Sequence, residues 1–420
     1  MSGSVKGDGE LFVGTRLLGI EMQKKTVKGM SVEGKRVLVR VDFNVPLDME
    51  TGAITDDSRI QASLPTIRYL VTCRAKVILC SHLGRPKGKI VEELRMAPIA
   101  RRLSELLELP VASADDCVGE EVKSKVEMLR EGDALLLENL RFHPEEEAND
   151  PSFAKELAEL ADLYVDDAFA TSHRAHASTV GVAQYLPAVA GFLLEKELEV
   201  LGRLLSEPKR PFGCVLGGAK VSDKMGLLQN MLRWVDVLLI GGGMAATFLK
   251  AQGYEVGNST VEEDKLDLAR ELLQEAAGEW TAKILLPVDV VVAPAITRGI
   301  SSQLVSIEGL PADSLIVDIG ANTIELFSDV LRRCHTVVWN GPVGVYEVPP
   351  FDHGTRSLVS VLSTLSNATT IIGGGSSAEV VQEMGLGDRM THVSTGGGAS
   401  LRFLEGAPLP GVEALLDQEE

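Results

Sequence analysis

The chain has few aromatic residues: they make up only 5% of its 420 residues, although 45% are hydrophobic. Its core must therefore consist mainly of Val, Leu, Ile and Ala, which is typical of a buried parallel sheet covered by helices. No apolar run reaches the length needed to cross a bilayer, so we expect no membrane-spanning helix.

Cysteines are also few, and they are scattered at Cys73, Cys80, Cys117, Cys214 and Cys334. Their number is odd and none belongs to a C-x-x-C pair, so the sequence predicts neither a disulfide framework nor a zinc site. Reduced, buried thiols are expected instead, and this cysteine usage is typical of a cytoplasmic protein.

Positive charge is in deficit, with 41 Lys and Arg against 60 Asp and Glu, a net charge of −19 and a pI of about 4.9. This balance argues against nucleic-acid binding and against binding to anionic membranes, because both need a broad basic surface. Any anionic ligand must therefore bind in a local basic pocket.

Short β-type runs alternate with helical patterns along almost the whole chain, which predicts parallel sheets with helices on both faces. The expected strands are Val37–Val41, Lys76–Cys80, Ala134–Leu137, Leu163–Asp166, Gly213–Leu216, Val235–Ile240, Lys283–Leu286, Leu315–Asp318, Val337–Trp339 and Thr369–Ile372. The expected helices include Ser58–Leu70, Met96–Leu107, Phe153–Leu160, Lys224–Leu232, Lys265–Ala277, Ile324–Arg333 and Ala378–Met384.

A charged amphipathic helix near the middle, Phe192–Leu201, precedes the breaker cluster Pro208-Lys209-Arg210-Pro211. An ordinary surface helix is the alternative, but a single core rarely grows beyond about 250–300 residues. We therefore expect an α/β protein of two doubly wound parallel-sheet (Rossmann-like) lobes, joined by this helix.

Polar residues follow the expected strands of the first half, where ligands bind in open α/β sheets. The first strand ends in Arg40-Val41-Asp42-Phe43-Asn44-Val45-Pro46, and later loops carry Arg85, Arg141 and Arg174, while Arg59 begins a helix. A single arginine is usually a solvated charge. Four at one edge, with His82, His173 and His176 nearby, indicate an anion site. A metal site made of the three histidines is a weaker alternative, because the arginines would repel a cation.

Glycine-rich turns follow the strands of the second half. They are Gly217-Gly218-Ala219-Lys220 with Lys224 beyond, Gly241-Gly242-Gly243, Gly373-Gly374-Gly375-Ser376-Ser377 and Gly396-Gly397-Gly398. The first is not a Walker A loop, and the second alone predicts only a tight strand-to-helix turn. The last two begin helices, where free backbone N–H groups can bind phosphate.

Five motifs occur in the order found in phosphoglycerate kinases, and together they are highly specific: RVDFNVP, SHLGRP, GGAKVSDK, WNGPVGVYE and STGGGAS. The chain resembles that family from Met22 to about Asp417. The resemblance implies an N-terminal extension at 1–21, a first lobe at 22–191 with the tail 405–420 packed on it, a hinge helix at 192–207 and a nucleotide-binding lobe at 208–404. A transit peptide is a weaker explanation of the extension.

The resemblance also implies the site residues. 3-Phosphoglycerate would be bound by Asp42, Asn44, Arg59, His82, Leu83, Gly84, Arg85, Arg141 and Arg174. ADP or ATP would be bound by Lys224, Gly241, Gly242, Asn340, Gly341, Glu347, Gly373, Gly374, Gly375, Ser376 and Ser377. Arg59, Lys220, Gly396 and Gly397 would stabilise the phosphoryl group during transfer from 1,3-bisphosphoglycerate to ADP.

One position departs from the family pattern, which has an acid where this chain has Ser376. That acid holds the Mg²⁺ that arrives with the nucleotide, and a hydroxyl is a poorer ligand for it. Glu379, three positions on, is the candidate to replace it as a ligand, directly or through water. A monomer is expected by analogy. A nicotinamide-dependent dehydrogenase built on Gly241–Gly243, and a non-catalytic nucleotide-binding relative, are the competing hypotheses.

Overall fold

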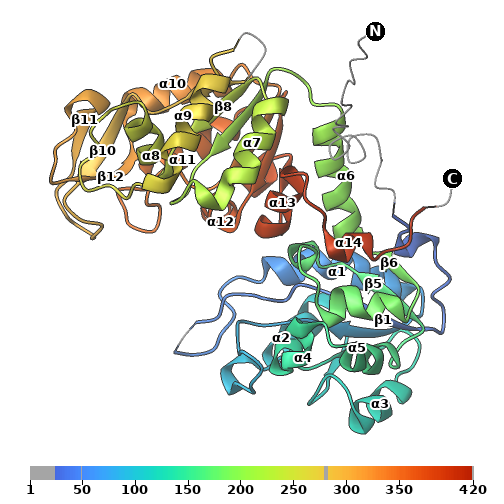
Figure 1. Cartoon of the computed structure of the whole chain (residues 1–420). Coiled ribbons are helices and arrows are strands. Elements are labelled where there is room, and N and C mark those ends of the chain that lie inside the picture. Colours follow the sequence, from blue (N-terminus) through green and yellow to red (C-terminus); the bar gives the residue numbers. More distant parts are fainter. Residues whose placement is uncertain (1–23, 49, 279–281, 419–420) are drawn as a thin grey trace, which may run out of the picture.

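The computed structural model describes residues 24–48, 50–278 and 282–418 of the chain. Two lobes, each built on a six-stranded sheet, lie on either side of helix α6 (Phe192–Ser206) (Figure 1). The expected extension at 1–21 lies outside the described residues.

The first sheet has the strand order β3-β4-β2-β1-β5-β6, and every neighbouring pair in it is parallel. Its strands are β1 (Arg36–Arg40), β2 (Lys76–Cys80), β3 (Val111–Ser113), β4 (Ala134–Leu136), β5 (Leu163–Asp166) and β6 (Ala188–Ala190). Its helices are α1 (Ser58–Thr72), α2 (Ala97–Leu107), α3 (Glu120–Glu127), α4 (Pro144–Ala148), α5 (Pro151–Ala158) and, from the end of the chain, α14 (Pro410–Glu413).

Alternation along β1 assigns its side chains to the two faces of the sheet. Val37 and Val39 pack in the core with α1 and α2, whereas Leu38 packs in the core with α3 and α5. Arg40 has the same parity as Leu38 and is 1% exposed. A strand that is buried on both faces thus ends in a buried guanidinium group.

The second sheet has the order β15-β14-β13-β7-β8-β9, again with parallel pairs only. Its strands are β7 (Phe212–Leu216), β8 (Val237–Ile240), β9 (Lys283–Leu285), β13 (Thr336–Asn340), β14 (Thr369–Gly373) and β15 (His392–Val393). Its helices are α7 (Met225–Trp234), α8 (Met244–Ala251), α9 (Leu266–Glu275), α10 (Ala321–Leu331), α11 (His353–Leu362), α12 (Gly375–Glu383) and α13 (Gly397–Leu404). The expected pair of parallel-sheet α/β lobes is confirmed.

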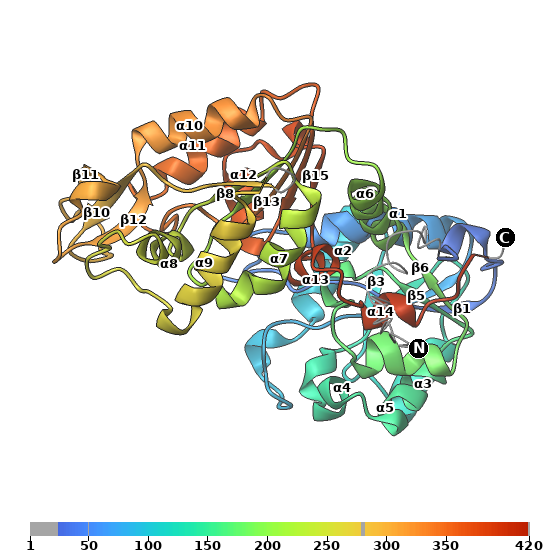
Figure 2. The same cartoon turned by 45° about the horizontal axis from the view of Figure 1, so that its top comes forward.

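A third, antiparallel sheet was not predicted. Strand β10 (Asp289–Ala293) pairs with both β11 (Gln303–Ser306) and β12 (Leu315–Ile319), at the end of the second lobe farthest from α6 (Figures 1 and 2). The expectation that Leu315–Asp318 belongs to a parallel sheet was wrong. No helix separates β10 from β11, so these two strands pair directly as antiparallel neighbours.

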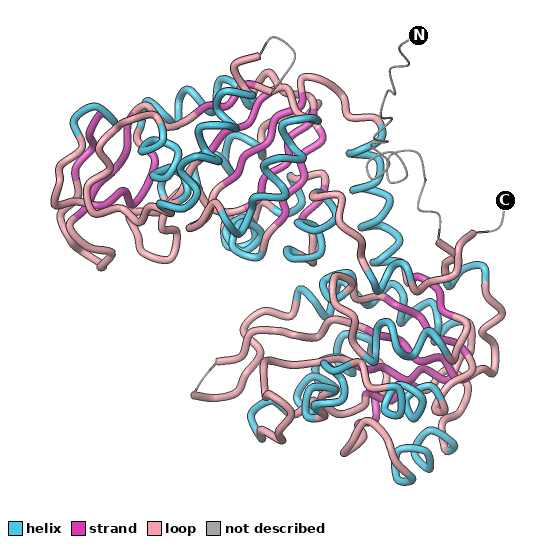
Figure 3. Tube along the Cα trace, viewed as in Figure 1, coloured by secondary structure: helices cyan, strands magenta, loops and turns pink. Residues whose placement is uncertain are grey.

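Helix α6 joins the cores of the two lobes. Its buried residues Leu194, Leu198, Leu201 and Leu204 belong to one apolar cluster that contains residues of both sheets. Two short helical segments follow β5: the 3₁₀ helix η4 (Phe169–Thr171) and the π-helix η5 (Ala177–Gly181). Figure 3 shows the two groups of strands separated by this helix.

The end of the chain returns to the first lobe, as expected. The Gly411 amide donates to the Ser172 carbonyl (2.9 Å), and the Leu416 amide donates to the carbonyl of Ala188, the first residue of β6 (2.9 Å). Lys24 pairs with Asp417 at 2.6 Å.

Four of the five cysteines are buried, Cys73 is half-buried, and all five are free thiols. Within residues 24–48, 50–278 and 282–418, none of the helices has both the length and the apolar character needed to span a membrane.

Candidate active site

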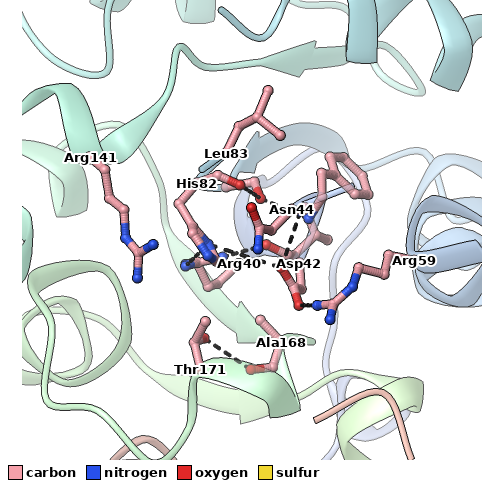
Figure 4. Close-up of polar contacts among 12 residues, drawn as sticks. Arg40, Asp42, Asn44, Arg59, His82, Leu83, Arg141, Ala168 and Thr171 are labelled. Carbon is pink, nitrogen blue, oxygen red and sulfur yellow. Dashed lines mark hydrogen bonds and ion pairs between the residues drawn. The ribbon is translucent and has the colours of Figure 1, made fainter. Parts of the chain in front are cut away.

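Polar side chains gather where β1, β2, β4 and β5 end, as parallel strands require. We call Arg40, Arg59, Arg141 and Arg174, which surround His82, the cationic cluster. Figure 4 shows Arg141 and Arg59 reaching from opposite sides toward Arg40, His82 and Asp42. The four guanidinium groups all lie close enough to His82 to lower its pKa. Of the four arginines predicted to converge here, Arg59, Arg141 and Arg174 lie around His82, whereas Arg85 is not among the charges that act on it.

Arg40 is the member of this cluster that sequence reasoning missed as a site residue. Its Nε donates to Ser178 Oγ (2.9 Å) and its Nη2 to His82 Nδ1 (3.1 Å). Ser178 in turn donates to Glu146 Oε1 (2.6 Å), and Glu146 is fully buried. Burial opposes ionisation of Glu146, but the hydrogen bond from His176 and the charge of Arg40 outweigh it and lower its pKa. The buried Glu146 carboxylate thus compensates the positive charge of Arg40.

His82 is neutral at physiological pH. Burial lowers its pKa most, and the charges of Arg40, Arg141, Arg174 and Arg59 lower it further. Because a guanidinium group can only donate, Nδ1 accepts from Arg40, and the ring proton is on Nε2. His82 can therefore offer a hydrogen bond to a ligand, while the arginines supply the charge.

Asp42 forms an ion pair with Arg59 that is largely shielded, since Asp42 is 5% exposed. Arg59 lies in the first turn of α1, directly after the loop that follows β1. The pair holds the Arg59 head at the sheet edge while leaving about a third of its side chain accessible.

The loop after β2 is shaped by two asparagines. Asn44 Oδ1 accepts from the Gly84 amide (2.8 Å), and Asn139 bonds both the amide and the carbonyl of Leu83 (3.2 and 2.8 Å). Gly84 has φ +63°, which favours glycine. Its carbonyl accepts from Arg141 Nη1 (2.8 Å), so this loop also orients the buried Arg141.

Arg174 is half-buried, and its Nε donates to His173 Nε2 (3.1 Å). Burial, together with the charge of Arg174, lowers the pKa of His173 to about 4. Arg85 is exposed, and within the described part of the chain it makes neither a hydrogen bond nor an ion pair. Its predicted contact with 3-phosphoglycerate would therefore form only when that ligand is bound.

The alternative of a metal site made of His82, His173 and His176 finds no support. Each ring has a different partner: Arg40 for His82, Arg174 for His173 and Glu146 for His176. The three histidines form no metal-binding group among the residues that the structure describes.

The glycine turns of the second lobe pack directly on one another, and we call them the glycine cluster. A Cβ on Gly242 would lie 2.7 Å from the Gly218 nitrogen and 2.8 Å from the Pro342 carbonyl oxygen. A Cβ on Gly397 would lie 2.8 Å from the Gly375 nitrogen. These turns come from β7, β8, β13, β14 and β15. The sheet edge is therefore lined by backbone, which a phosphate can approach closely.

Lys224 and Asn340 form the polar centre of this cluster. Lys224 Nζ donates to the Asn340 carbonyl oxygen (3.1 Å) and to its side-chain oxygen. Burial lowers the pKa of Lys224 to about 8. Asn340 Nδ2 is buried without a hydrogen-bond partner and lies beside Gly373 and Gly374. An unpaired buried donor next to a lysine is suited to a phosphate oxygen.

The turn after β14 begins α12, as the sequence predicts. Ser377 Oγ is buried and accepts from the Gly341 amide (2.7 Å), so it fixes the turn after β13. Ser376 is half-buried in the first turn of α12. Glu379, the expected substitute ligand, accepts from the Tyr346 hydroxyl (2.9 Å), and Glu347 is exposed.

The run Gly396–Gly398 lies where the lobes touch. A Cβ on Gly396 would lie 2.7 Å from Phe169 Cδ1 in η4, and one on Gly398 would lie 3.2 Å from His173 Cε1. The start of α13 therefore packs on the loop that carries Arg174. Lys220 is exposed, and in the described residues no hydrogen bond links it to the cationic cluster.

Fold and sites together define a two-lobed α/β protein with a cationic ligand-binding edge on one lobe and a backbone-lined edge on the other. The phosphoglycerate kinase family model matches residues 27–407. The chain is 58% identical over 397 residues to phosphoglycerate kinase of Pelotomaculum thermopropionicum, covering 94% of this chain and 100% of that protein. It is 56% identical over 400 residues to phosphoglycerate kinase of Dictyoglomus turgidum, with 94% and 100% covered.

Solved structures agree with this assignment. Phosphoglycerate kinase from Coxiella burnetii matches with a TM-score of 0.81 and 41% identity, covering 93% of this chain and 98% of that chain. The enzyme from Pyrococcus horikoshii OT3 matches with a TM-score of 0.82 and 35% identity, with the same coverage. The chain belongs to the phosphoglycerate kinase family. The hypothesis of a nicotinamide-dependent dehydrogenase was therefore wrong.

Proposed function

We propose that this chain catalyses reversible phosphoryl transfer between 1,3-bisphosphoglycerate and ADP, giving 3-phosphoglycerate and ATP, in glycolysis, gluconeogenesis or carbon fixation. The observation that carries the proposal is the pairing of two sites: a cluster of four arginines on one sheet edge and an edge of glycine amides with Lys224 on the other. The first suits a phosphorylated acid and the second suits nucleotide phosphates.

In the first site, Arg141, Arg174 and Arg40 supply the charge that holds the 3-phosphoglycerate phosphate, with His82 donating a hydrogen bond. Asp42 and Asn44 orient the hydroxyl and carboxylate end. Asp42 alone would repel the acid, but Arg59 neutralises it. The acceptor carboxylate is already ionised at neutral pH, so the reaction needs no general base.

In the second site, Asn340 Nδ2 and Lys224 would bind phosphate oxygens, and the amides at the start of α12 would bind the nucleotide's terminal phosphates. Gly241 and Gly242 would lie against the adenine and Glu347 against the ribose. Lys220, Arg59 and the amides of Gly396 and Gly397 would stabilise the charge of the phosphoryl group during in-line transfer.

Magnesium fits this site when it arrives with the nucleotide, since Ser376 lies in the first turn of α12 and Glu379 in the next, beside the turn that would hold the phosphates. Mg²⁺ held there would supply positive charge that offsets the charge of the phosphates. The chain would contribute one hydroxyl and one carboxylate, so most of the ligands would be phosphate and water oxygens.

Transfer requires the two edges to meet, and we propose that the lobes close about α6. In this mechanism residues 22–191 form the first moving lobe, residues 192–207 the hinge helix and residues 208–404 the second lobe. Closure would bring Arg59 to the phosphoryl group and exclude the water that would otherwise hydrolyse the acyl phosphate. A monomer acting in the cytoplasm completes the proposal.

A coupled assay with 3-phosphoglycerate, ATP and Mg²⁺ tests the proposal. Turnover is expected in the full chain, and Arg141→Ala should raise the KM for 3-phosphoglycerate by about 10- to 100-fold, as loss of a charged hydrogen bond would. Arg101→Ala, which removes an exposed arginine, is the control. ATP binding without turnover would instead support the non-catalytic relative.

A further inference from the structure

A separate polar cluster lies beside the Arg141 loop, outside both sites. It consists of Asp116 and Cys117, in the loop between β3 and α3, and His143, two residues after Arg141. Each offers one ligand atom, and these atoms all lie within 4.8 Å of one another. The three side chains come from two loops, and no spacing motif in the sequence predicts that they lie together.

The cluster is ordered before any ligand binds. The His143 ring stacks on Phe153 of α5, with 4.9 Å between ring centroids. Its Nε2 lies 2.6 Å from Asp116 Oδ1, which also accepts from the Cys117 amide (2.6 Å). The Glu138 amide donates to the Asp116 carbonyl (3.3 Å), which ties this loop to the end of β4.

The thiol forms the floor of the cluster. Cys117 is fully buried, and its Sγ donates to the Glu138 carbonyl (3.0 Å), whereas the Asp116 side chain is 56% and the His143 side chain 26% exposed. A cation can therefore enter from solvent past Asp116 and His143. Burial raises the pKa of the Cys117 thiol most, and the carboxylates of Asp116, Glu146 and Glu138 raise it further. The partly exposed Asp116 carboxylate supplies negative charge at the entrance to the cluster, which favours a bound cation.

We propose that Asp116, Cys117 and His143 form a binding site for a zinc-class divalent cation, with the fourth position open to water. Tetrahedral zinc bonds of about 2.0–2.3 Å place ligand atoms about 3.3–3.8 Å apart, so small side-chain shifts suffice. Thiolate, imidazole and carboxylate together suit zinc or cobalt, while magnesium prefers oxygen alone.

The proton balance of binding is simple. Cys117 loses its thiol proton to solvent as the sulfur–metal bond forms, and the His143 ring proton moves to Nδ1 so that Nε2 can coordinate. Asp116 gives up the short contact with Nε2 and binds through a carboxylate oxygen. No oxidant or reductant is needed. The site does not depend on the proposed catalytic function, and it would tie His143 to the 116–117 loop.

Cobalt titration of the nucleotide-free full chain tests this site, because a cobalt–thiolate bond gives an intense near-ultraviolet charge-transfer band. We expect one equivalent to bind, with a band that Zn²⁺ removes and excess Mg²⁺ does not. Cys117→Ser should abolish the band. His143→Asn and Asp116→Asn should each weaken binding by about tenfold or more. Cys73→Ser and His335→Asn, at a cysteine and a histidine outside the cluster, should leave it unchanged.

Absence of the band, its survival in Cys117→Ser, or its loss in Cys73→Ser would overturn the proposal. Circular dichroism checks that each variant is folded. Should Cys117→Ser fail to fold, the two partly exposed positions decide. Binding as tight as in the unaltered chain by both His143→Asn and Asp116→Asn would then exclude the site.

Discussion

Glu197 Oε2 on α6 lies 2.7 Å from His392 Nε2 in β15. The other carboxylate oxygen, Oε1, accepts from the amide and the hydroxyl of Thr395 (2.8 and 2.9 Å). Glu197 has no exposed surface and His392 is 6% exposed. The helix between the lobes is thus bonded, through one buried carboxylate, to the strand that leads into Gly396–Gly398.

Glu197→Ala should therefore destabilise the protein strongly. Removing one partner leaves His392 and the Thr395 amide buried without the carboxylate, a change that typically costs about 3–5 kcal/mol. Urea unfolding measures the change. Glu197→Gln, which keeps a hydrogen-bonding side chain, should lose less. Glu199→Ala removes an exposed pair with Arg203 on the same helix and should change stability by less than about 1 kcal/mol. Equal losses at both positions would contradict the prediction.

The lowered pKa of Lys224 leads us to predict that nucleotide binding depends on pH. Burial lowers its pKa to about 8, so the side chain loses its charge as the pH rises through about 8. Affinity for metal-free ADP should be highest below that pH and fall above it by about 10- to 100-fold in total, the range for a charged hydrogen bond. Calorimetric titration between pH 7 and 9.5 measures this. Lys224→Arg should remove the fall, because arginine stays charged. An unchanged fall in that variant would exclude Lys224 as its cause.

Ser376→Asp should tighten binding of magnesium with the nucleotide, because a carboxylate is a better ligand than a hydroxyl. Magnesium titrations of activity at fixed ATP measure the effect. Ser366→Asp adds the same charge at an exposed position and is the control. Glu379→Gln tests the substitute ligand separately, and its titration curve should shift toward higher Mg²⁺. Coincident curves for Ser376→Asp and the unaltered chain would refute the prediction.

Asp167 predicts a loss of stability with rising pH. Its Oδ1 accepts from the Leu193 amide (2.8 Å) at the start of α6, and burial raises its pKa to about 8. The folded state thus binds this proton more tightly than the unfolded chain, whose aspartate has a pKa of about 4. The contribution is present in full below pH 4 and is lost as the pH rises through about 8.

Asp167→Asn imitates the protonated form, so the variant should be more stable than the unaltered chain at pH 8, by on the order of 1–3 kcal/mol, and nearly equal at pH 4. Unfolding in urea at several pH values measures the difference. Asp313→Asn, at an exposed position, should show no such trend. A pH-independent difference would rule out titration of Asp167 as the cause.

The repeating part of the fold could be predicted from local pattern. Expected strands such as Lys76–Cys80 and Leu163–Asp166 match β2 and β5 in full, because a buried parallel strand is a nearly continuous hydrophobic run. The antiparallel sheet could not be predicted in this way. Its strands β10 and β12 are also rich in apolar residues, and only the direction of their pairing sets them apart from the parallel strands. Pairing direction depends on the connection, which period alone does not reveal.

The site was predictable wherever a charged residue follows a strand. Arg141 and Arg174 follow strands and were predicted as site residues. Arg40 is instead the last residue of its own strand, where the sequence pattern indicates an ordinary surface charge. Its burial depends on Glu146 and Ser178, more than a hundred residues along the chain. Glu197 and His392 are separated by 195 positions. Such pairings are set by tertiary packing and carry no local signature.

The strap formed by residues 409–417 has a consequence for synthesis. It bonds to Ser172, Ala188, Lys24 and Lys25, all of which precede the second lobe in the chain. A ribosome delivers the first sheet long before this strap emerges, so the Ser172 and Ala188 carbonyls of the nascent first lobe lack their strap partners until the second lobe has been made. Completion of the earlier-made half is thereby coupled to translation of the last residues of the strap.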